Sequence, residues 1–278
     1  MVKERITVFT VLKNIFLAIM LILVVVPFFW MIMTSLQPDT AHVLAKPVRF
    51  PFPPAFSNYI KAWNAEPFDI YTVNSIIIAV SATILQIFTA ILAAYAFSAL
   101  HFRGKNILFL LVLAVLMMPT QVAIIPLYMT ISKLGWLDSY KALIIPFAAD
   151  AYGIFLIRQN FLAIPKDYAE AAKIEGAGHL RIAFQVYGRL SVPSLIAYGI
   201  MAFKWRWNDY FWVLIMTSST AKRTLPVGIV MMKEVADGGT QWHILMAATL
   251  IVLAPMIVLY LALQKYFTND YLKGGLKG

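Results

Sequence analysis

The chain of 278 residues contains no cysteine, and this absence excludes three kinds of chemistry. Without cysteine there are no disulfide bonds, no thiolate metal sites and no cysteine nucleophile. The four histidines are far apart in the sequence, and none belongs to an HExxH pattern or to another cluster with metal-ligand spacing. We therefore expect isolated surface or interfacial histidines and no metal site.

Motifs for nucleotide binding and for hydrolysis are also missing. No GxxxxGK[ST] pattern occurs, because the Gly104-Lys105 pair lacks both the upstream glycine and the following Ser or Thr. The GxSxG pattern of serine hydrolases is absent as well, and the few acidic residues are scattered rather than paired. We expect that the chain is not an enzyme and that it has no cofactor of its own.

Charged residues are scarce, at 13% of the chain, whereas 61% of the residues are hydrophobic and the mean hydropathy is +0.77. In soluble domains about 45–50% of residues are apolar and about 25% are charged. The composition therefore predicts an integral membrane protein. The net charge of +10 fits basic loops at the cytoplasmic surface and does not indicate a nucleic-acid partner.

Six apolar stretches are long enough to cross a membrane as helices, because about 20 residues span the hydrocarbon core. They cover approximately residues 14–34, 75–97, 107–129, 141–161, 194–216 and 243–265. The predicted fold is all-α, with one polytopic membrane domain over residues 1–278. The first stretch is too long for a signal peptide and lacks an A-x-A cleavage site, so we expect it to be retained. Interruptions by proline are expected in the third, fourth and sixth spans, at Pro119, Pro126, Pro146 and Pro255.

The distribution of basic residues predicts that both termini are cytoplasmic. In this orientation 13 of the 23 Lys and Arg residues fall in inner segments, 8 in outer segments and 2 within a span. Lys and Arg accumulate on the cytoplasmic side of membrane proteins. An outer loop then covers 37–70, and its six prolines favour an extended, stiff chain. This loop either docks an external partner or simply connects two spans.

The loop 162–192, between the fourth and fifth spans, lies on the predicted cytoplasmic side and contains EAAKIEGAG at 170–178. Small residues on one helical face allow another backbone to approach closely, and Gly176 and Gly178 are expected to end the short helix. A second amphipathic stretch around 180–189 suits the membrane surface. From these residues alone, an ordinary amphipathic loop and a docking element for a soluble protein are equally supported.

EAAKIEGAG resembles the EAA loop of ABC importer permeases, in which Gly follows EAA after three residues and a Pro comes further on. Here Pro193 lies seventeen residues after Gly176. In that family the loop forms a coupling helix that inserts into a cleft of the ATPase subunit. The resemblance implies that the contact is made by Glu170, Ala171, Ala172, Glu175 and Gly176. The chain departs from the family in having Glu175 in place of the usual Asp, and Gly188-Arg189 in place of Leu-Pro.

The resemblance extends over nearly the whole chain and is to the carbohydrate-importer branch, specifically to its MalG-like permeases. The similar segments follow the family's order: MTSLQP (33–38), SNYIKAW (57–63), NSIIIA (74–79), LMMPTQVAIIPLY (116–128), GIFLIRQNFLAIPKDYAEAA (153–172), WNDYFWVLI (207–215), TLPVGI (224–229) and the terminal GGLKG. The resemblance implies a permease subunit of an ATP-driven importer for a sugar or related polyol, in the cytoplasmic membrane of a bacterium or archaeon.

The same resemblance implies a set of partners. These are a second, MalF-like permease subunit, an ATPase dimer that carries ATP and Mg²⁺, an extracytoplasmic solute-binding protein, the sugar and the lipid bilayer. The glycine-rich C-terminus is either a disordered end or, as the resemblance implies, a tail that reaches the ATPase dimer interface. The residues of that tail are Gly274, Gly275, Lys277 and Gly278.

Ionisable residues within predicted spans are candidates for a transport pathway. In a continuous fifth helix, the residues of KWRWNDYFW at positions 205, 208, 209 and 212 share one face. Aromatic faces and hydrogen-bonding groups suit a sugar, and the resemblance implies that this part of the span borders the substrate cavity. The predicted pathway residues are Asp150, Trp205, Arg206, Asn208, Asp209 and Trp212.

Several alternatives remain open for these residues. The tryptophans suit anchoring at the interface, and the charges suit a structural ion pair, for example between Asp150 and Arg206. A secondary transporter driven by an ion gradient would use Asp150 and Asp209 as proton sites, and a membrane-embedded enzyme is disfavoured because no catalytic constellation is present. Within the importer family, Lys204 and Arg206 favour an anionic ligand such as glycerol phosphate.

Overall fold

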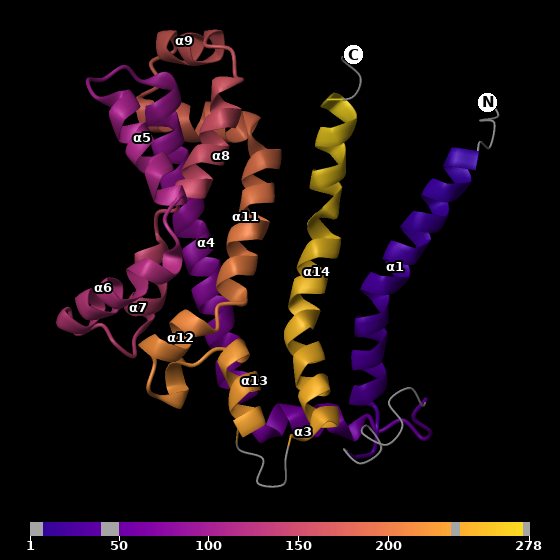
Figure 1. Cartoon of the computed structure of the whole chain (residues 1–278). Coiled ribbons are helices and arrows are strands. Elements are labelled where there is room, and N and C mark those ends of the chain that lie inside the picture. The colour runs from indigo at the N-terminus through magenta and orange to yellow at the C-terminus, as the bar shows by residue number, and fades with distance from the viewer. Residues whose placement is uncertain (1–7, 40–49, 235–239, 275–278) are drawn as a thin grey trace. The chain divides into compact units, whose positions relative to one another are not determined.

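The computed structural model describes residues 8–39, 50–234 and 240–274, and these residues form helices and no strand (Figure 1). The predicted all-α fold is confirmed. Two compact units are present, of which one combines residues 1–68 with 229–254 and the other combines 69–228 with 255–278.

Four stretches of helix are long and apolar enough to cross a membrane, and they coincide with four of the predicted spans. They are Phe9–Ser35, Phe68–Ala99, Tyr140–Leu162 and Trp242–Gln264. The corresponding elements are α1 (Val8–Ser35), α4 (Phe68–Ala99), the succession of α7 (Tyr140–Ile144), η1 (Ile145–Phe147) and α8 (Ala151–Leu162), and α14 (Trp242–Gly274). Pro146 lies in η1, whereas α14 continues through Pro255.

The third predicted span is bent rather than straight. It consists of α5 (Lys105–Leu116) and α6 (Thr120–Lys133), which meet at an angle of 103°. Pro119 stands at the junction, where its missing N–H and its ring prevent the helix from continuing. Pro126, by contrast, lies inside α6.

The prediction of one continuous helix over 194–216 is wrong. Helix α11 (Val192–Trp207) ends at Trp207, and residues 208–210 separate it from α12 (Phe211–Met216). At its start, α11 is bent by 89° from the preceding helical stretch His179–Gly188. If each bent pair counts as one span, the described part of the chain contains up to six.

The first unit joins the end of α1 to α3 (Ser57–Ala65). Asn58 on α3 is fully buried, and its Nδ2 donates hydrogen bonds to the carbonyl oxygens of Ser35 (2.8 Å) and Gln37 (2.7 Å). The predicted outer loop 37–70 therefore contains a packed helix, and it ends early because α4 begins at Phe68. Most large side chains of α1 are not covered by the rest of the chain. A helix that is apolar on every side is typical of a membrane span, whose side chains face lipid.

The core of the second unit lies between α4, α8, α11 and the helical stretch that precedes α11. That stretch comprises α10 (His179–Arg181) and η2 (Ile182–Gly188), which is π-helical. Helix α9 (Asp167–Ile174) is attached to this core through Ala169. The buried core residues are Ala90, Ile91, Ala94, Tyr95, Ile157, Phe161, Ala169, Ile182, Ala183, Tyr187, Tyr198 and Ala202.

Asn74 of α4 links three segments of this unit. Its side chain is buried, and Nδ2 donates to the carbonyl oxygens of Ala221 (2.9 Å) and Arg223 (2.8 Å). Its Oδ1 accepts a hydrogen bond from the Tyr140 hydroxyl at 2.6 Å. This single amide therefore fixes the start of α7 and the segment 221–223 against α4.

Replacing Asn74 by alanine is expected to lower the free energy of unfolding by about 2–4 kcal/mol, because two carbonyls and a hydroxyl lose their buried partner. Denaturant unfolding in detergent, followed by tryptophan fluorescence, measures the change. Asn208→Ala is the matched control, since it removes an exposed amide. Equal stability of the two variants would contradict the proposed role of Asn74.

Asp138 stabilises a neighbouring turn that lies outside the spans. Its Oδ1 accepts hydrogen bonds from the backbone N–H groups of Ser218 and Ser219, both at 3.1 Å. Burial raises the pKa of the Asp138 carboxyl. Hydrogen bonds from both serines and the charge of Lys222 lower this pKa by more than burial raises it, so the resulting pKa lies below its ordinary value. The carboxylate is therefore held in the charged form that accepts these bonds.

Candidate coupling and pathway sites

The C-terminus of α9 is closed by a glycine cap. The N–H of Ala177 donates to the carbonyl oxygen of Ala172 (2.9 Å), and that of Gly176 donates to Lys173 (2.9 Å), which is the Schellman pattern. Gly176 has φ of 81°, in the left-handed region that residues with a Cβ rarely adopt. A Cβ built at Gly176 would have no atom of the chain within 4 Å, so packing within the chain does not require glycine here.

Helix α9 has one face toward the core and one face exposed. Ala169 is buried and Ala172 is half-buried against the core, so Ala172 points away from the surface on which we expected it. The other predicted contact residues, Glu170, Ala171, Glu175 and Gly176, are exposed. The structure thus divides the predicted set into one anchor and four surface residues.

Two large side chains of α9 that lie outside the predicted contact set are exposed. Ile174 is 88% exposed and Tyr168 is 54% exposed. An isoleucine so exposed, at the end of a short helix that the chain's own core does not cover, indicates a contact surface. A signal was present in the sequence, since both residues stand in the polar loop 162–192.

Asp150 caps a helix and is already engaged. It precedes α8, and its Oδ2 accepts hydrogen bonds from the N–H of Gly153 and from the Tyr198 hydroxyl, both at 2.9 Å. Glycine is required at position 153 because a Cβ there would overlap the Tyr198 ring. The carboxylate therefore ties the start of α8 to the middle of α11.

The ion pair that we gave as an example, between Asp150 and Arg206, is not the one that the structure contains. Arg206 pairs instead with Asp209, with Nη1 and Oδ2 2.8 Å apart and each side chain 16% exposed. The guanidinium lies over the Phe147 ring at 3.6 Å from its centroid. Asp209 also accepts the backbone N–H of Trp212 at 3.2 Å, so it helps to start α12 after the break.

The four residues expected on one helical face do not share a face, because the helix ends before Asn208. Trp212 is buried, its Nε1 donates to the carbonyl oxygen of Ala142 (3.0 Å), and its ring packs edge-on against Phe147. Trp205 is 43% exposed and packs edge-on against Tyr152, and Asn208 is exposed. The structure thus gathers Arg206, Asp209 and Trp212 around Phe147 and leaves Trp205 and Asn208 accessible.

The predicted C-terminal contact is only partly described. Gly274 is the last residue of α14, and Gly275, Lys277 and Gly278 lie outside the described residues. Among the residues that the structure describes, no group of three or more His, Asp or Glu side chains could hold a metal ion.

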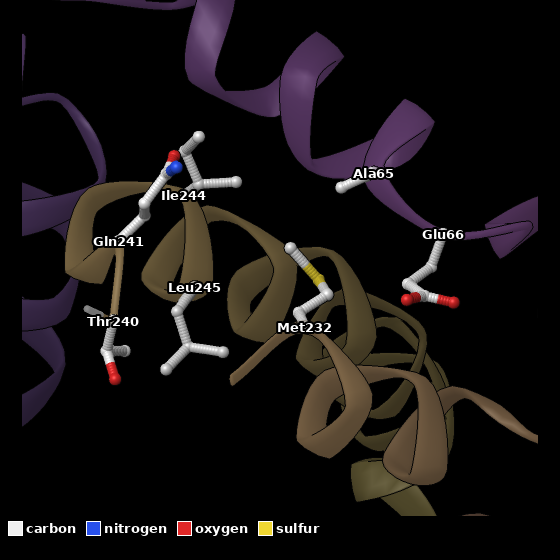
Figure 2. A pocket seen from close by; sticks show the side chains of 7 residues that line it. All are labelled: Ala65, Glu66, Met232, Thr240, Gln241, Ile244 and Leu245. Atoms are coloured by element: carbon white, nitrogen blue, oxygen red, sulfur yellow. The ribbon is translucent and has the colours of Figure 1, made fainter. Parts of the chain in front are cut away.

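A pocket of about 170 Å³ lies in the first unit, between the end of α3, α13 (Leu225–Glu234) and the start of α14. Figure 2 shows the Glu66 carboxylate and the Gln241 amide at this pocket, with Met232 and Leu245 supplying apolar surface.

The described helices, with several candidate spans and a short helix between two of them, define a polytopic membrane protein. Over residues 86–273 the chain matches the family described as "Binding-protein-dependent transport system inner membrane component". The chain belongs to this family of ABC importer permeases, and it is therefore a transport subunit of the membrane rather than an enzyme.

Relatives with similarity over nearly their whole length support this assignment. The chain is 33% identical over 266 residues to the probable ABC transporter permease protein YurM of Bacillus subtilis, covering 95% of this chain and 87% of YurM. It is also 33% identical over 262 residues to the sn-glycerol-3-phosphate transport system permease protein UgpE of Yersinia pestis, covering 92% of this chain and 93% of UgpE.

A solved structure has the same fold. A chain in the crystal structure of a bacterial ABC transporter involved in the import of the acidic polysaccharide alginate superimposes with a TM-score of 0.82. The match covers 94% of this chain and 96% of the other, with 24% sequence identity.

Proposed function

We propose that this chain is one of two permease subunits of an ATP-driven importer for a sugar or related polyol, and that α9 receives motion from a separate ATPase. The observation that carries the proposal is the surface of α9. Its inner face is anchored through Ala169, while Ile174 and Tyr168 are exposed beside the cap at Gly176. A short helix with a fixed inner face and an uncovered apolar outer face is suited to docking in a groove.

ATP and Mg²⁺ belong to the partner ATPase in this proposal, because the sequence contains no P-loop. The excess of basic residues in the segments that include α9 supports a cytoplasmic position for α9 and for both termini. In that orientation the segments that line the pocket beside Glu66 are predicted outer segments, where the solute-binding protein implied by the family's description would dock.

For the substrate, the geometry of the broken fifth span removes one of the reasons to expect an anion and fits a sugar or related polyol. Arg206 is already neutralised by Asp209, which removes one of the two cations that favoured an anionic ligand. Lys204 remains exposed, and Trp205 and Asn208 offer an aromatic ring and an amide nearby in sequence. Aromatic rings stack on the apolar faces of sugars, and amides bind their hydroxyls.

The alternative of an ion-driven secondary transporter is less well supported. Asp150 accepts two hydrogen bonds and Asp209 is paired with Arg206, so both carboxylates have structural roles. A proton site must change its protonation during transport, which would break these contacts.

We expect the tagged chain, purified from native membranes, to bring down a P-loop ATPase and a second permease. In sealed vesicles with the solute-binding protein outside, uptake of labelled sugar is expected with ATP inside and is absent with only a proton or sodium gradient. Uptake driven by a gradient without ATP would overturn the importer proposal in favour of secondary transport.

A further inference from the structure

A second cavity, of about 660 Å³, lies between the end of α4, the start of α5 and the end of α8. Two cationic side chains line it, Lys105 from α5 and Arg158 from α8. Neither residue belongs to the coupling surface or to the broken fifth span, so the transport function leaves them without a role.

Contacts to the end of α4 hold both cations in place. The Arg158 Nε donates to the carbonyl oxygen of Phe97 at 2.9 Å, and its guanidinium lies 3.9 Å from the centroid of the Phe109 ring. The Lys105 Nζ donates to the carbonyl oxygens of Ser98 (3.2 Å) and Leu100 (2.8 Å). Among the described residues, the terminal nitrogens of Arg158 and the third N–H of Lys105 have no hydrogen-bond acceptor, and they remain available for a ligand.

No carboxylate of the described residues pairs with the cationic side chains of the cavity. The positive charges of Arg158 and Lys166 both act on Lys105. In the part of the chain that the structure describes, neither Lys105 nor Arg158 has a carboxylate within 4.0 Å. Positive charges held this close together favour a bound anion with several acceptor oxygens.

The surroundings of the cavity are apolar and exposed, which points to a lipid. Phe102, Ile107 and Leu162 line the cavity and are 38%, 67% and 50% exposed. Beyond them, α5 continues with Leu110 and Leu111, which are 64% and 58% exposed. A cationic cavity that adjoins an uncovered apolar helix is complementary to a phospholipid, in which a charged phosphate group is followed by acyl chains.

We propose that this cavity binds the phosphate headgroup of an anionic phospholipid, with Arg158 and Lys105 contacting the phosphate and the acyl chains lying along α5. Basic pockets at the ends of transmembrane helices recognise such headgroups. The proposal depends neither on the ATPase nor on the transported substrate.

Native mass spectrometry of the full-length chain, titrated with phosphatidylglycerol or phosphatidylcholine, tests the site. We expect one tightly retained phosphatidylglycerol, weaker retention of phosphatidylcholine, and an affinity for phosphatidylglycerol that falls about tenfold in Arg158→Gln. Arg181→Gln is the matched control, because it removes an exposed arginine outside the cavity, and it is expected to bind as the wild type does.

Since loss of the Arg158–Phe97 contact could disturb the fold, Leu162→Trp provides a second variant. It fills the cavity and leaves every charge in place, and it is also expected to lose the retained phosphatidylglycerol. Equal retention of the two lipids, or unchanged phosphatidylglycerol affinity in both cavity variants, would overturn the proposal. Displacement of the lipid by inorganic phosphate at equal concentration would overturn it too, because the site would then be one for a soluble anion.

Discussion

Arg206→Met is expected to lower the free energy of unfolding by about 3–5 kcal/mol, the range found when one partner of a buried ion pair is removed. The reason is Asp209, whose side chain is only 16% exposed and would be left as an uncompensated charge. Arg206 also covers the Phe147 ring, so the variant loses packing as well as charge. Denaturant unfolding in detergent, followed by tryptophan fluorescence, measures the loss.

A double variant, Arg206→Met with Asp209→Asn, separates the ion pair from a role in transport. The amide introduced by Asp209→Asn still offers an oxygen to the N–H of Trp212, and no charge is left unpaired, so stability is expected to recover to within about 1–2 kcal/mol of the wild type. Recovered stability without recovered uptake would assign the pair to the transport pathway. Recovery of both would make it structural, and a double variant no more stable than Arg206→Met would contradict the pairing itself.

Gly176→Asp is expected to weaken binding of the ATPase about 30-fold or more, as for loss of an interface hot spot worth about 2 kcal/mol, and to abolish ATP-driven uptake. At φ of 81° a residue with a Cβ is disfavoured by about 1–2 kcal/mol, and the new carboxylate would project from the docking surface. Since no atom of the chain lies within 4 Å of the added Cβ, the damage is expected in the partner contact rather than in the core. Co-purification of the ATPase and the second permease measures both associations.

Gly178→Asp is the matched control for this experiment. Gly178 has φ of −72° and open space around an added Cβ, and it precedes α10, where aspartate is a favourable cap. We expect this variant to retain both partners. Gly176→Asn adds a neutral side chain of nearly the same shape and with a comparable tolerance of the left-handed conformation, so a difference between the two variants isolates the effect of the charge. Normal ATPase binding by Gly176→Asp would show that the end of α9 is not the contact.

The sequence predicts best those elements that depend on composition alone. Helices α1, α4 and α14 follow from long apolar runs, and the end of α9 follows from Gly176. The bend between α5 and α6 coincides with Pro119, whose ring and missing N–H disfavour continuation of the preceding helix. Proline alone does not decide such a break, because α6 contains Pro126 and α14 continues through Pro255. Local rules were sufficient for the apolar helices and for the glycine cap, since no distant residue was needed to decide these outcomes.

The break after Trp207 could not be predicted in the same way. Residues 208–210 contain neither proline nor glycine, and apolar residues continue on both sides. The break is stabilised by Asp209, which pairs with Arg206 and accepts from Trp212, and by Phe147, which arrives from a distant part of the chain. Such a contact has no periodicity in the sequence, so the sequence did not indicate Asp209, rather than Asp150, as the partner of Arg206.

The hydrogen bond from the Tyr198 hydroxyl to Asp150 joins α11 to the start of α8, and it thereby closes the intervening helices into a frame. The two residues are 48 positions apart, and α8, α9, η2 and the start of α11 lie between them along the chain. Helix α8 alone has 12 residues, so the bond lies about 18 Å along its axis from the end that leads to α9. A frame closed at both ends resists shear better than an open hairpin. A force applied to α9 should therefore displace α8 and α11 together, as two sides of one rigid body.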